Sequence, residues 1–342
     1  MTGKISTFVM MSEAKEILKK LSSGDSKALA RCITIVENEL PGYEEILSSL
    51  KFTREVPVIG FTGPPGAGKS TLINVLLTFL SQKNKKVGVI AIDPTSPFNF
   101  GSLLGDRLRM SEHFSNENIF IRSLATRGSL GGLSAKTIEV VDVFRAFLFS
   151  PSPIPPVSDS DRKWRNGEQE KRGFDYIFIE TVGVGQSEVE VAGLADTTVL
   201  VLAPGFGDEV QTLKSGIMEI GDIFVINKSD NPGADGLATT IDHLVSGNSS
   251  FAIRHSSAGW IPPVLKVIAT QQEGIEPLAK KIDEHFAKAA NEKKLFLYTE
   301  KAYKLIQNNR MKNLDKKKLQ KEIEKEMKGK DFNLYKMIKN HF

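Results

Sequence analysis

The sequence contains a single cysteine, Cys32, among 342 residues. One thiol excludes an internal disulfide framework, and its place in the helical pattern Ala30-Arg31-Cys32-Ile33 predicts a buried structural position instead of a reactive nucleophile. The histidines are few and scattered, at His113, His243, His255, His285 and His341. Because histidine and cysteine do not cluster, the sequence does not favour a site for a soft transition metal.

Long apolar runs and a secretory leader are absent as well. No uninterrupted hydrophobic stretch approaches the roughly 20 residues that span a bilayer, and Met1–Ser6 lacks the basic-then-apolar layout of a signal peptide. We therefore expect a cytoplasmic protein that does not enter a membrane.

The chain also has little excess charge. Its formal net charge is +4, and much of the excess lies in a lysine-rich tail around residues 316–330. In that tail Leu319, Ile323 and Met327 recur every fourth residue, the spacing of an amphipathic helix. Aromatic residues do not alternate with the basic ones, as a groove for single-stranded nucleic acid requires. We therefore expect a solvated helical face and no nucleic-acid partner.

Apolar, β-branched runs alternate with helical stretches through most of the chain. The predicted strands cover residues 58–61, 87–92, 119–124, 176–179, 198–202, 223–226 and 264–268. Continuous apolar strands separated by helices are typical of a mostly parallel sheet covered on both faces. The sequence therefore predicts a doubly wound α/β domain over residues 56–288, with a helical segment over 1–55 and a helical extension over 289–342. The proline-rich and then charged stretch 151–172 predicts a mobile insertion in this domain.

The most specific motif is the loop from Gly63 to Thr71, which follows an apolar strand and precedes a helical stretch. Its spacing, G-x-x-x-x-G-K-[ST], lets backbone N–H groups surround an anion at a helix N-terminus, where the helix dipole favours negative charge. Lys69 can then reach the β- and γ-phosphates, and the Ser70 hydroxyl can ligate Mg²⁺. The predicted phosphate-binding residues are Gly63, Pro64, Pro65, Gly66, Ala67, Gly68, Lys69, Ser70 and Thr71.

A second motif indicates which nucleotide binds. The apolar run 223–226 is followed by Asn227-Lys228-Ser229-Asp230, the pattern N-K-x-D. The Asp230 carboxylate can accept the N1–H and 2-amino protons of guanine, a donor pair that adenine lacks. With adenine the carboxylate would be desolvated without a partner, which costs free energy. The sequence therefore predicts GTP and GDP as ligands.

Further polar residues follow predicted strands at the same sheet edge, where ligands collect in open α/β sheets. Glu180 can hold Mg²⁺ or orient an attacking water, or it can simply cap the following helix. The Gly183 N–H can bond the γ-phosphate, so this turn would relax when the phosphate leaves. Asp93 and Asp106 are predicted metal ligands in a first switch segment. Arg107 can neutralise developing charge or pair with Asp106 at the surface.

These motifs together resemble one family, the MeaB/ArgK-type GTPases that accompany adenosylcobalamin-dependent methylmalonyl-CoA mutase. The resemblance covers roughly residues 13 to 285. It rests on Gly63–Thr71, Asp93–Pro97, Leu104–Met110, Ala125–Ser134, Glu180–Glu188, Gly207–Glu209, Gly216–Asp230 and Ala269–Ile275.

The resemblance implies a homodimeric GTPase chaperone that binds the mutase and gates the loading and protection of its cofactor. Adenosylcobalamin would then be met only through the partner enzyme, and the helical tail is similar in kind to the family's dimerisation arm. By motif, Lys69, Ser70, Asp93, Asp106 and Glu180 would form the phosphate and metal site. Asn227, Lys228, Asp230 and the backbone of Ala269 would hold guanine. Asp208 and Lys214 would belong to a further switch that couples the nucleotide state to the mutase.

Three other functions remain open from the residues. A P-loop kinase acting on a small molecule or a transport protein needs a substrate-positioning base, and no acid or histidine beyond those assigned to GTP and Mg²⁺ suggests one. A nickel-delivery GTPase needs clustered histidine or cysteine ligands. An interaction module with negligible turnover would also fit, because a partner can supply the activation of a slow GTPase.

Overall fold

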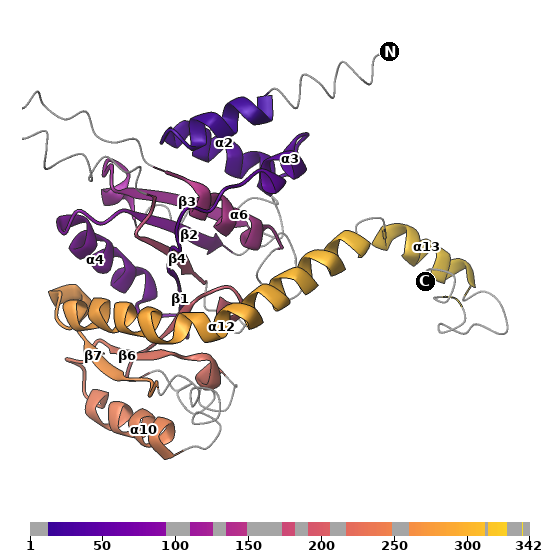
Figure 1. Ribbon diagram of the computed structural model, residues 1–342. Coiled ribbons are helices and arrows are strands. Elements are labelled where there is room, and N and C mark those ends of the chain that lie inside the picture. Colours follow the sequence, from indigo (N-terminus) through magenta and orange to yellow (C-terminus); the bar gives the residue numbers. More distant parts are fainter. Residues whose placement is uncertain are drawn as a thin grey trace, which may run out of the picture. The chain divides into compact units, whose positions relative to one another are not determined.

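The computed structural model places the chain in two compact units, Met1–Leu297 and Tyr298–Phe342, which are described separately below (Figure 1). The residues that the structure describes are 13–93, 110–125, 135–148, 173–181, 191–205, 217–247, 260–311, 314–326 and 337.

A seven-stranded parallel sheet forms the centre of the first unit. Its strands, in chain order, are β1 Val58–Thr62, β2 Val87–Asp93, β3 Ile119–Ala125, β4 Tyr176–Glu180, β5 Thr197–Leu202, β6 Ile223–Asn227 and β7 Val264–Val267. In space the order is β3-β2-β4-β1-β5-β6-β7, and every strand pair is parallel. All seven predicted strands are confirmed. Every residue of β1, β4, β5 and β6 is buried, as expected of strands covered on both faces.

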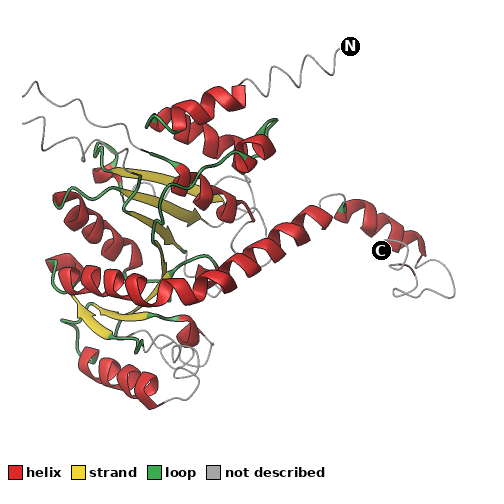
Figure 2. Ribbon diagram, in the orientation of Figure 1, coloured by secondary structure: helices red, strands yellow, loops and turns green. Residues whose placement is uncertain are grey.

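Helices cover both faces of the sheet (Figure 2). On one face, α4 (Lys69–Gln82) and the first part of α12 (Ile275–Met311) pack together against the core, with Leu76 and Ile282 among the buried contacts. On the other face lie α2 (Ser26–Glu37), α6 (Ala135–Ala146) and α10 (Ala234–Gly247). Successive residues of β5 face opposite sides of the sheet. Val199 and Val201 belong to the core under α4 and α12, whereas Leu200 and Leu202 belong to the core under α10. The predicted doubly wound fold is confirmed.

The remaining elements are short. They are a helix over residues 13–21, α3 Tyr43–Ser48, and the 3₁₀ turns η1 Ser111–His113, η3 Val191–Gly193, η4 Ile217–Ile220 and η5 Ala269–Gln271.

The amino-terminal helices are part of the main core. Asp25 caps α2 by accepting the N–H groups of Lys27 and Ala28 at 2.8 and 3.2 Å. Cys32 is fully buried on this helix, and burial raises the pKa of its thiol to about 12. The predicted structural position of Cys32 is therefore confirmed.

Three aspartates close the amino ends of the strands, each by accepting a backbone N–H from the start of a neighbouring strand. Asp175, before β4, accepts the N–H of Lys86 at 2.8 Å. Asp196, before β5, accepts that of Val58 at 2.9 Å. Asp222, before β6, accepts that of Thr198 at 2.8 Å. These contacts fix the register of the strand pairs β2–β4, β1–β5 and β5–β6, and we refer to the three residues as the strand-start aspartates.

The second unit contains the end of α12 and a separate helix, α13 (Lys316–Glu326). The predicted amphipathic helix is present: Leu319 and Ile323 are its partly buried residues, while Met327 lies outside the described part of the chain. No helix in the described residues combines the length and the apolar character that a bilayer span requires.

Candidate nucleotide-binding site

The predicted phosphate loop connects β1 to α4 and needs its glycines. Gly63, Gly66 and Gly68 have φ values of 137°, 79° and 88°. A side chain at Gly63 would put its Cβ only 2.0 Å from the carbonyl oxygen of Val201, so the loop also requires close approach of two backbones. The helix starts at Lys69, directly after the left-handed Gly68. Its first N–H groups therefore lie beside the loop, as an anion site requires.

Lys69 directs its ammonium group at the loop. The side chain is 6% exposed, and Nζ donates hydrogen bonds to the carbonyl oxygens of Gly63 at 2.7 Å and Pro64 at 3.0 Å. A cation held here, at the positive end of a helix dipole, forms a concentrated positive potential. The arrangement is chemically suited to a polyphosphate.

Ser70 and Glu180 meet across the loop. The Ser70 hydroxyl donates to Oε1 of Glu180 at 2.5 Å, and Glu180 is 5% exposed. Glu180 ends β4, where it pairs with Phe61 of β1 and Ala91 of β2. This register puts its carboxylate beside the phosphate loop, as the sequence predicts.

The same residues fit a magnesium ion by their chemistry. Mg²⁺ prefers oxygen ligands and is usually held by one or two carboxylates together with substrate phosphates. Ser70 and Glu180 supply a hydroxyl and a carboxylate, and Asp93 ends the adjacent strand β2. Within the described residues no three His, Cys, Asp or Glu side chains form a metal-binding group, and the side chain of Asp93 lies outside that description.

Asn227 connects three segments that are far apart in the sequence. Its Nδ2 donates to the carbonyl oxygen of Ala67 at 2.9 Å, and its Oδ1 accepts the N–H of Ala269 at 3.2 Å. The side chain is 2% exposed. The N-K-x-D motif, the phosphate loop and the Ala269 segment therefore lie together. The sequence predicts the first two at one sheet edge, and the family resemblance implies the third.

The two other members of the motif differ in environment. Lys228 adopts the left-handed conformation, with φ of 55°, which turns the chain sharply after β6. Asp230 is exposed. The fold thus leaves the Asp230 carboxylate at the surface, next to the turn, where a ligand can reach it.

Thr181 is a residue of this edge that the sequence reasoning did not single out. Its backbone N–H and hydroxyl both donate to the carbonyl oxygen of Phe61, at 3.2 and 3.3 Å. It joins the end of β4 to the end of β1, immediately before the phosphate loop. The sequence could have predicted this position, because Thr181 directly follows Glu180 in the motif Glu180-Thr181-Val182-Gly183.

Several predicted site residues fall outside the described part of the chain. These are Asp106, Arg107, Gly183, Asp208 and Lys214, together with the predicted insertion at 151–172. Their predicted roles stay predictions.

Known proteins with sequences similar to this chain include several that are named as GTPases. A GTPase of Escherichia coli, ArgK, is 33% identical over 276 residues, covering 79% of this chain and 75% of that protein. A Pyrococcus abyssi protein named as a GTPase is 45% identical over 271 residues, covering 79% and 75%. The mouse protein named methylmalonic aciduria type A homolog, mitochondrial, is 35% identical over 270 residues, covering 75% of this chain and 59% of that protein.

A solved structure and a family model extend the comparison. The crystal structure of an LAO/AO transport system kinase matches with a TM-score of 0.57 and 21% identity, covering 96% of each chain, which shows the shared fold. The family model described as "Methylmalonyl Co-A mutase-associated GTPase MeaB" matches residues 29–151 and 169–328. The unmatched residues between these ranges lie within the predicted insertion 151–172. The chain belongs to the MeaB family of methylmalonyl-CoA mutase-associated GTPases.

Proposed function

We propose that this protein binds and hydrolyses GTP and that it acts as a chaperone for a cobalamin-dependent acyl-CoA mutase. The proposal of nucleotide binding rests on the position of Asn227, whose side chain bonds to both the phosphate loop and the Ala269 backbone. This contact supports one continuous site in which Gly63–Thr71 hold the phosphates. Asn227, Lys228, Asp230 and Ala269 surround the guanine.

In this site Lys69 neutralises the β- and γ-phosphates, and Glu180 orients the attacking water. The Gly183 N–H bonds the γ-phosphate, so that its loss on hydrolysis releases the following segment. Ser70, Asp93, Asp106 and Glu180 hold Mg²⁺, which when bound supplies charge neutralisation to the triphosphate. The contact between Ser70 and Glu180 supports the assignment of these two ligands.

The partner is proposed from the family. Membership of the mutase-associated GTPases supports methylmalonyl-CoA mutase, or a related acyl-CoA mutase, as the client. Asp208 and Lys214 then couple the nucleotide state to the mutase surface. Adenosylcobalamin is loaded or protected on the mutase, so this chain meets the cofactor only through its partner. We further propose that the complex acts in the cytoplasm.

We also propose three segments, a helical segment over 1–55, a GTPase domain over 56–288 and a dimerisation extension over 289–342, and a homodimer formed through the last of them. Within the second unit Tyr298, Tyr303, Ile306 and Met311 are between 51% and 65% exposed on α12. Several large apolar side chains exposed on one short stretch of helix commonly mark a protein interface. A second copy of the chain is the proposed occupant of this stretch, and the change Ile306→Lys is expected to convert dimer to monomer in light scattering.

The deciding experiment measures GTP turnover with and without purified methylmalonyl-CoA mutase. We expect tight GTP binding, slow release of free phosphate, and a rate that changes at least several-fold when the mutase is added. Lys69→Ala serves as the control without phosphate binding. A mutase that neither binds nor alters the rate would remove the chaperone part and leave GTP binding standing. Transfer of the labelled γ-phosphate to an acceptor protein or small molecule would instead identify a kinase.

A further inference from the structure

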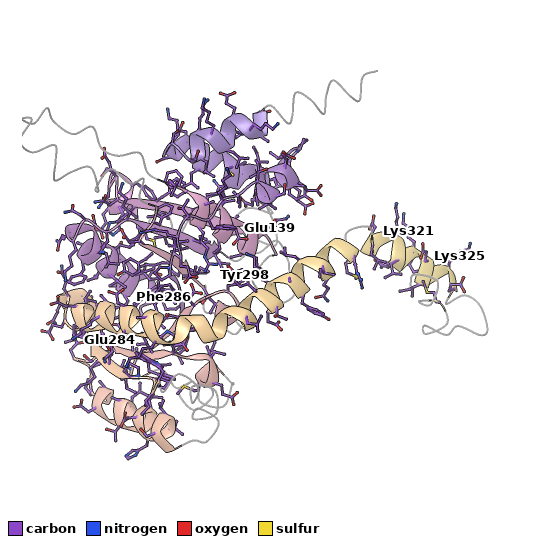
Figure 3. The ribbon with its side chains drawn as sticks, in the orientation of Figure 1. Glu139, Glu284, Phe286, Tyr298, Lys321 and Lys325 are labelled. Carbon is purple, nitrogen blue, oxygen red and sulfur yellow. The ribbon has the colours of Figure 1, made fainter. Side chains whose placement is uncertain are left out.

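A buried polar cluster lies at the sheet edge opposite the phosphate loop. It consists of Thr197, Asp222, Trp260 and His285, which we call the amino-end cluster. Asp222 and His285 are both fully buried, and Thr197 is also without exposed surface. His285 is a residue of α12, located in the chain between Glu284 and Phe286, which are labelled in Figure 3. Charged and polar groups are rarely fully buried unless they are paired.

The contacts within the cluster converge on His285 and Asp222. Nδ1 of His285 lies 2.8 Å from the hydroxyl of Thr197, and its Nε2 lies 3.5 Å from Oδ1 of Asp222. The indole Nε1 of Trp260 donates to the carbonyl oxygen of Asp222 at 2.9 Å, and its ring meets the His285 ring edge to face at 4.9 Å. Thus the imidazole of His285 brings α12 into contact with Thr197 at the start of β5, with Asp222 before β6 and with Trp260 before β7.

The strands that begin at this cluster end at the proposed guanine site. Asp222 directly precedes β6, which ends in Asn227, and Trp260 precedes β7, which leads to Ala269. A five-residue strand spans only about 16 Å and does not stretch. The two strands are also locked in register, since the N–H of Phe224 donates to Pro263 and that of Ser229 donates to Val267. A displacement at their amino ends would therefore move Asn227 and Ala269 with the strands.

We propose that His285 is a positioning residue for guanine recognition, which sets the placement of β6 and β7 through the amino-end cluster. The inference rests on the proposed guanine site and adds a determinant of its specificity. Packing of α12 does not require a histidine here, because Leu278 and Ile282 of the same helix already fill the apolar core. What the imidazole adds is direction: Nδ1 lies within hydrogen-bond distance of the Thr197 hydroxyl at the start of β5, and Nε2 faces Asp222 before β6 at 3.5 Å. An aliphatic side chain cannot make these polar contacts.

The proposal is tested by the ratio of GDP affinity to ADP affinity, measured by calorimetry on the full chain. His285→Leu keeps an apolar side chain of similar size and removes both polar contacts. We expect it to lower this ratio at least tenfold, mainly through weaker GDP binding, because GDP and ADP share the phosphate contacts of Gly63–Thr71 and differ in the base. His285→Gln retains polar atoms in the cluster and should recover part of the ratio. Thr197→Val, which removes one contact, should lower the ratio about threefold.

A matched control separates positioning from general loss of stability. Ile282→Val removes one methyl group from the same helix, one turn before His285, without touching the cluster. We expect it to lower the melting temperature while leaving the ratio unchanged. If His285→Leu and Thr197→Val are folded and keep a ratio within twofold of wild type, the inference is wrong, although the guanine site stands.

Two further outcomes are decisive. If His285→Leu does not fold, Thr197→Val alone decides: a wild-type ratio in that variant overturns the inference, and a reduced ratio supports it. If the wild-type protein itself binds ADP as well as GDP, the proposed guanine site fails and the inference fails with it. The two kinds of failure are therefore distinguished by the wild-type measurement.

Discussion

The two edges of the sheet both carry buried or partly buried carboxylates, but with different partners. At the carboxyl edge Glu180 accepts a bond from the Ser70 hydroxyl at the start of α4, within the proposed ligand site. At the amino edge the strand-start aspartates accept backbone N–H groups of neighbouring strands. A carboxylate bonded to the backbone of the fold stabilises the sheet, whereas one bonded to a movable hydroxyl is available to a ligand. The amino edge sets the positions of the strands, and the carboxyl edge carries the groups proposed to meet the ligand.

The largest expected effect at the carboxyl edge comes from Lys69→Ala. Loss of a charge-assisted contact to the phosphates should weaken GTP binding by about 100-fold to 1000-fold. The free energy of unfolding should change little, because the two hydrogen bonds described for this lysine are to carbonyl oxygens of its own loop. Calorimetry with GTP and thermal denaturation measure the two quantities. A variant that binds GTP normally would contradict the phosphate-site assignment.

At the amino edge, Asp196→Ala should show the reverse behaviour. Asp196 accepts the Val58 N–H and pairs with Arg145 at 3.0 Å, and burial raises the pKa of its carboxyl more than these contacts lower it. Removing it leaves a mostly buried guanidinium without this partner, which should cost about 3 kcal/mol of unfolding free energy. Denaturant unfolding measures this loss, and GTP affinity should stay within twofold.

The control for this prediction is the double change of Asp196→Leu with Arg145→Met, which removes both charges and should recover part of the lost stability. An Asp196→Ala variant that is as stable as wild type, or one that loses GTP binding while remaining folded, would break the contrast between the edges.

The change Asp230→Asn sharpens the comparison within the ligand edge. It replaces the acceptor carboxylate by an amide of the same shape and should lower GDP affinity about 10-fold to 100-fold, with little effect on ADP. Because Asp230 is exposed, the melting temperature without nucleotide should not change. Competition binding with GDP and ADP measures the outcome. An unaltered purine preference would remove Asp230 from the guanine site.

The smallest expected effect concerns Cys32, which lies away from both edges. Its pKa is about 12 in the folded protein against an ordinary value of 9.0, so the unfolded chain loses the proton first as pH rises. The unfolding free energy should therefore fall above about pH 9, by about 1 kcal/mol at pH 10. Unfolding curves of wild type and Cys32→Ala at pH 8 and pH 10 measure the difference. An equal change in unfolding free energy between pH 8 and pH 10 in the two proteins would contradict burial of the thiol.

Much of the fold could be predicted from the sequence because β1, β4, β5 and β6 are fully buried. Runs such as Val58–Phe61 and Ile223–Ile226 are apolar throughout and short, which favours buried strands over surface segments or long helices. The phosphate loop was equally clear, since its spacing follows directly from how a backbone encloses an anion.

The contacts between segments were harder to predict. That Asn227 reaches the carbonyl of Ala67 depends on β5 lying between β1 and β6, and the apolar pattern of the strands does not specify their spatial order. The strand-start aspartates were missed for the same reason: each is a single acidic residue whose partner lies on another strand. The predicted roles of Asp106, Gly183, Asp208 and Lys214 are untested, because these residues lie outside the described part of the chain.

The strand-start aspartates also bear on how the chain reaches its native state. Neighbouring strands of this sheet come from distant parts of the chain, as with β1 and β5, whose paired residues are more than a hundred positions apart. Such parallel pairs form slowly and can be joined one residue out of step. In a misaligned pair the carboxylate would face a carbonyl or an apolar group and would lack its N–H partner. Such a pair would be less stable and would dissociate before the helices pack over the sheet. The strand-start aspartates would thus favour the correct alignment of strand pairs while the sheet assembles.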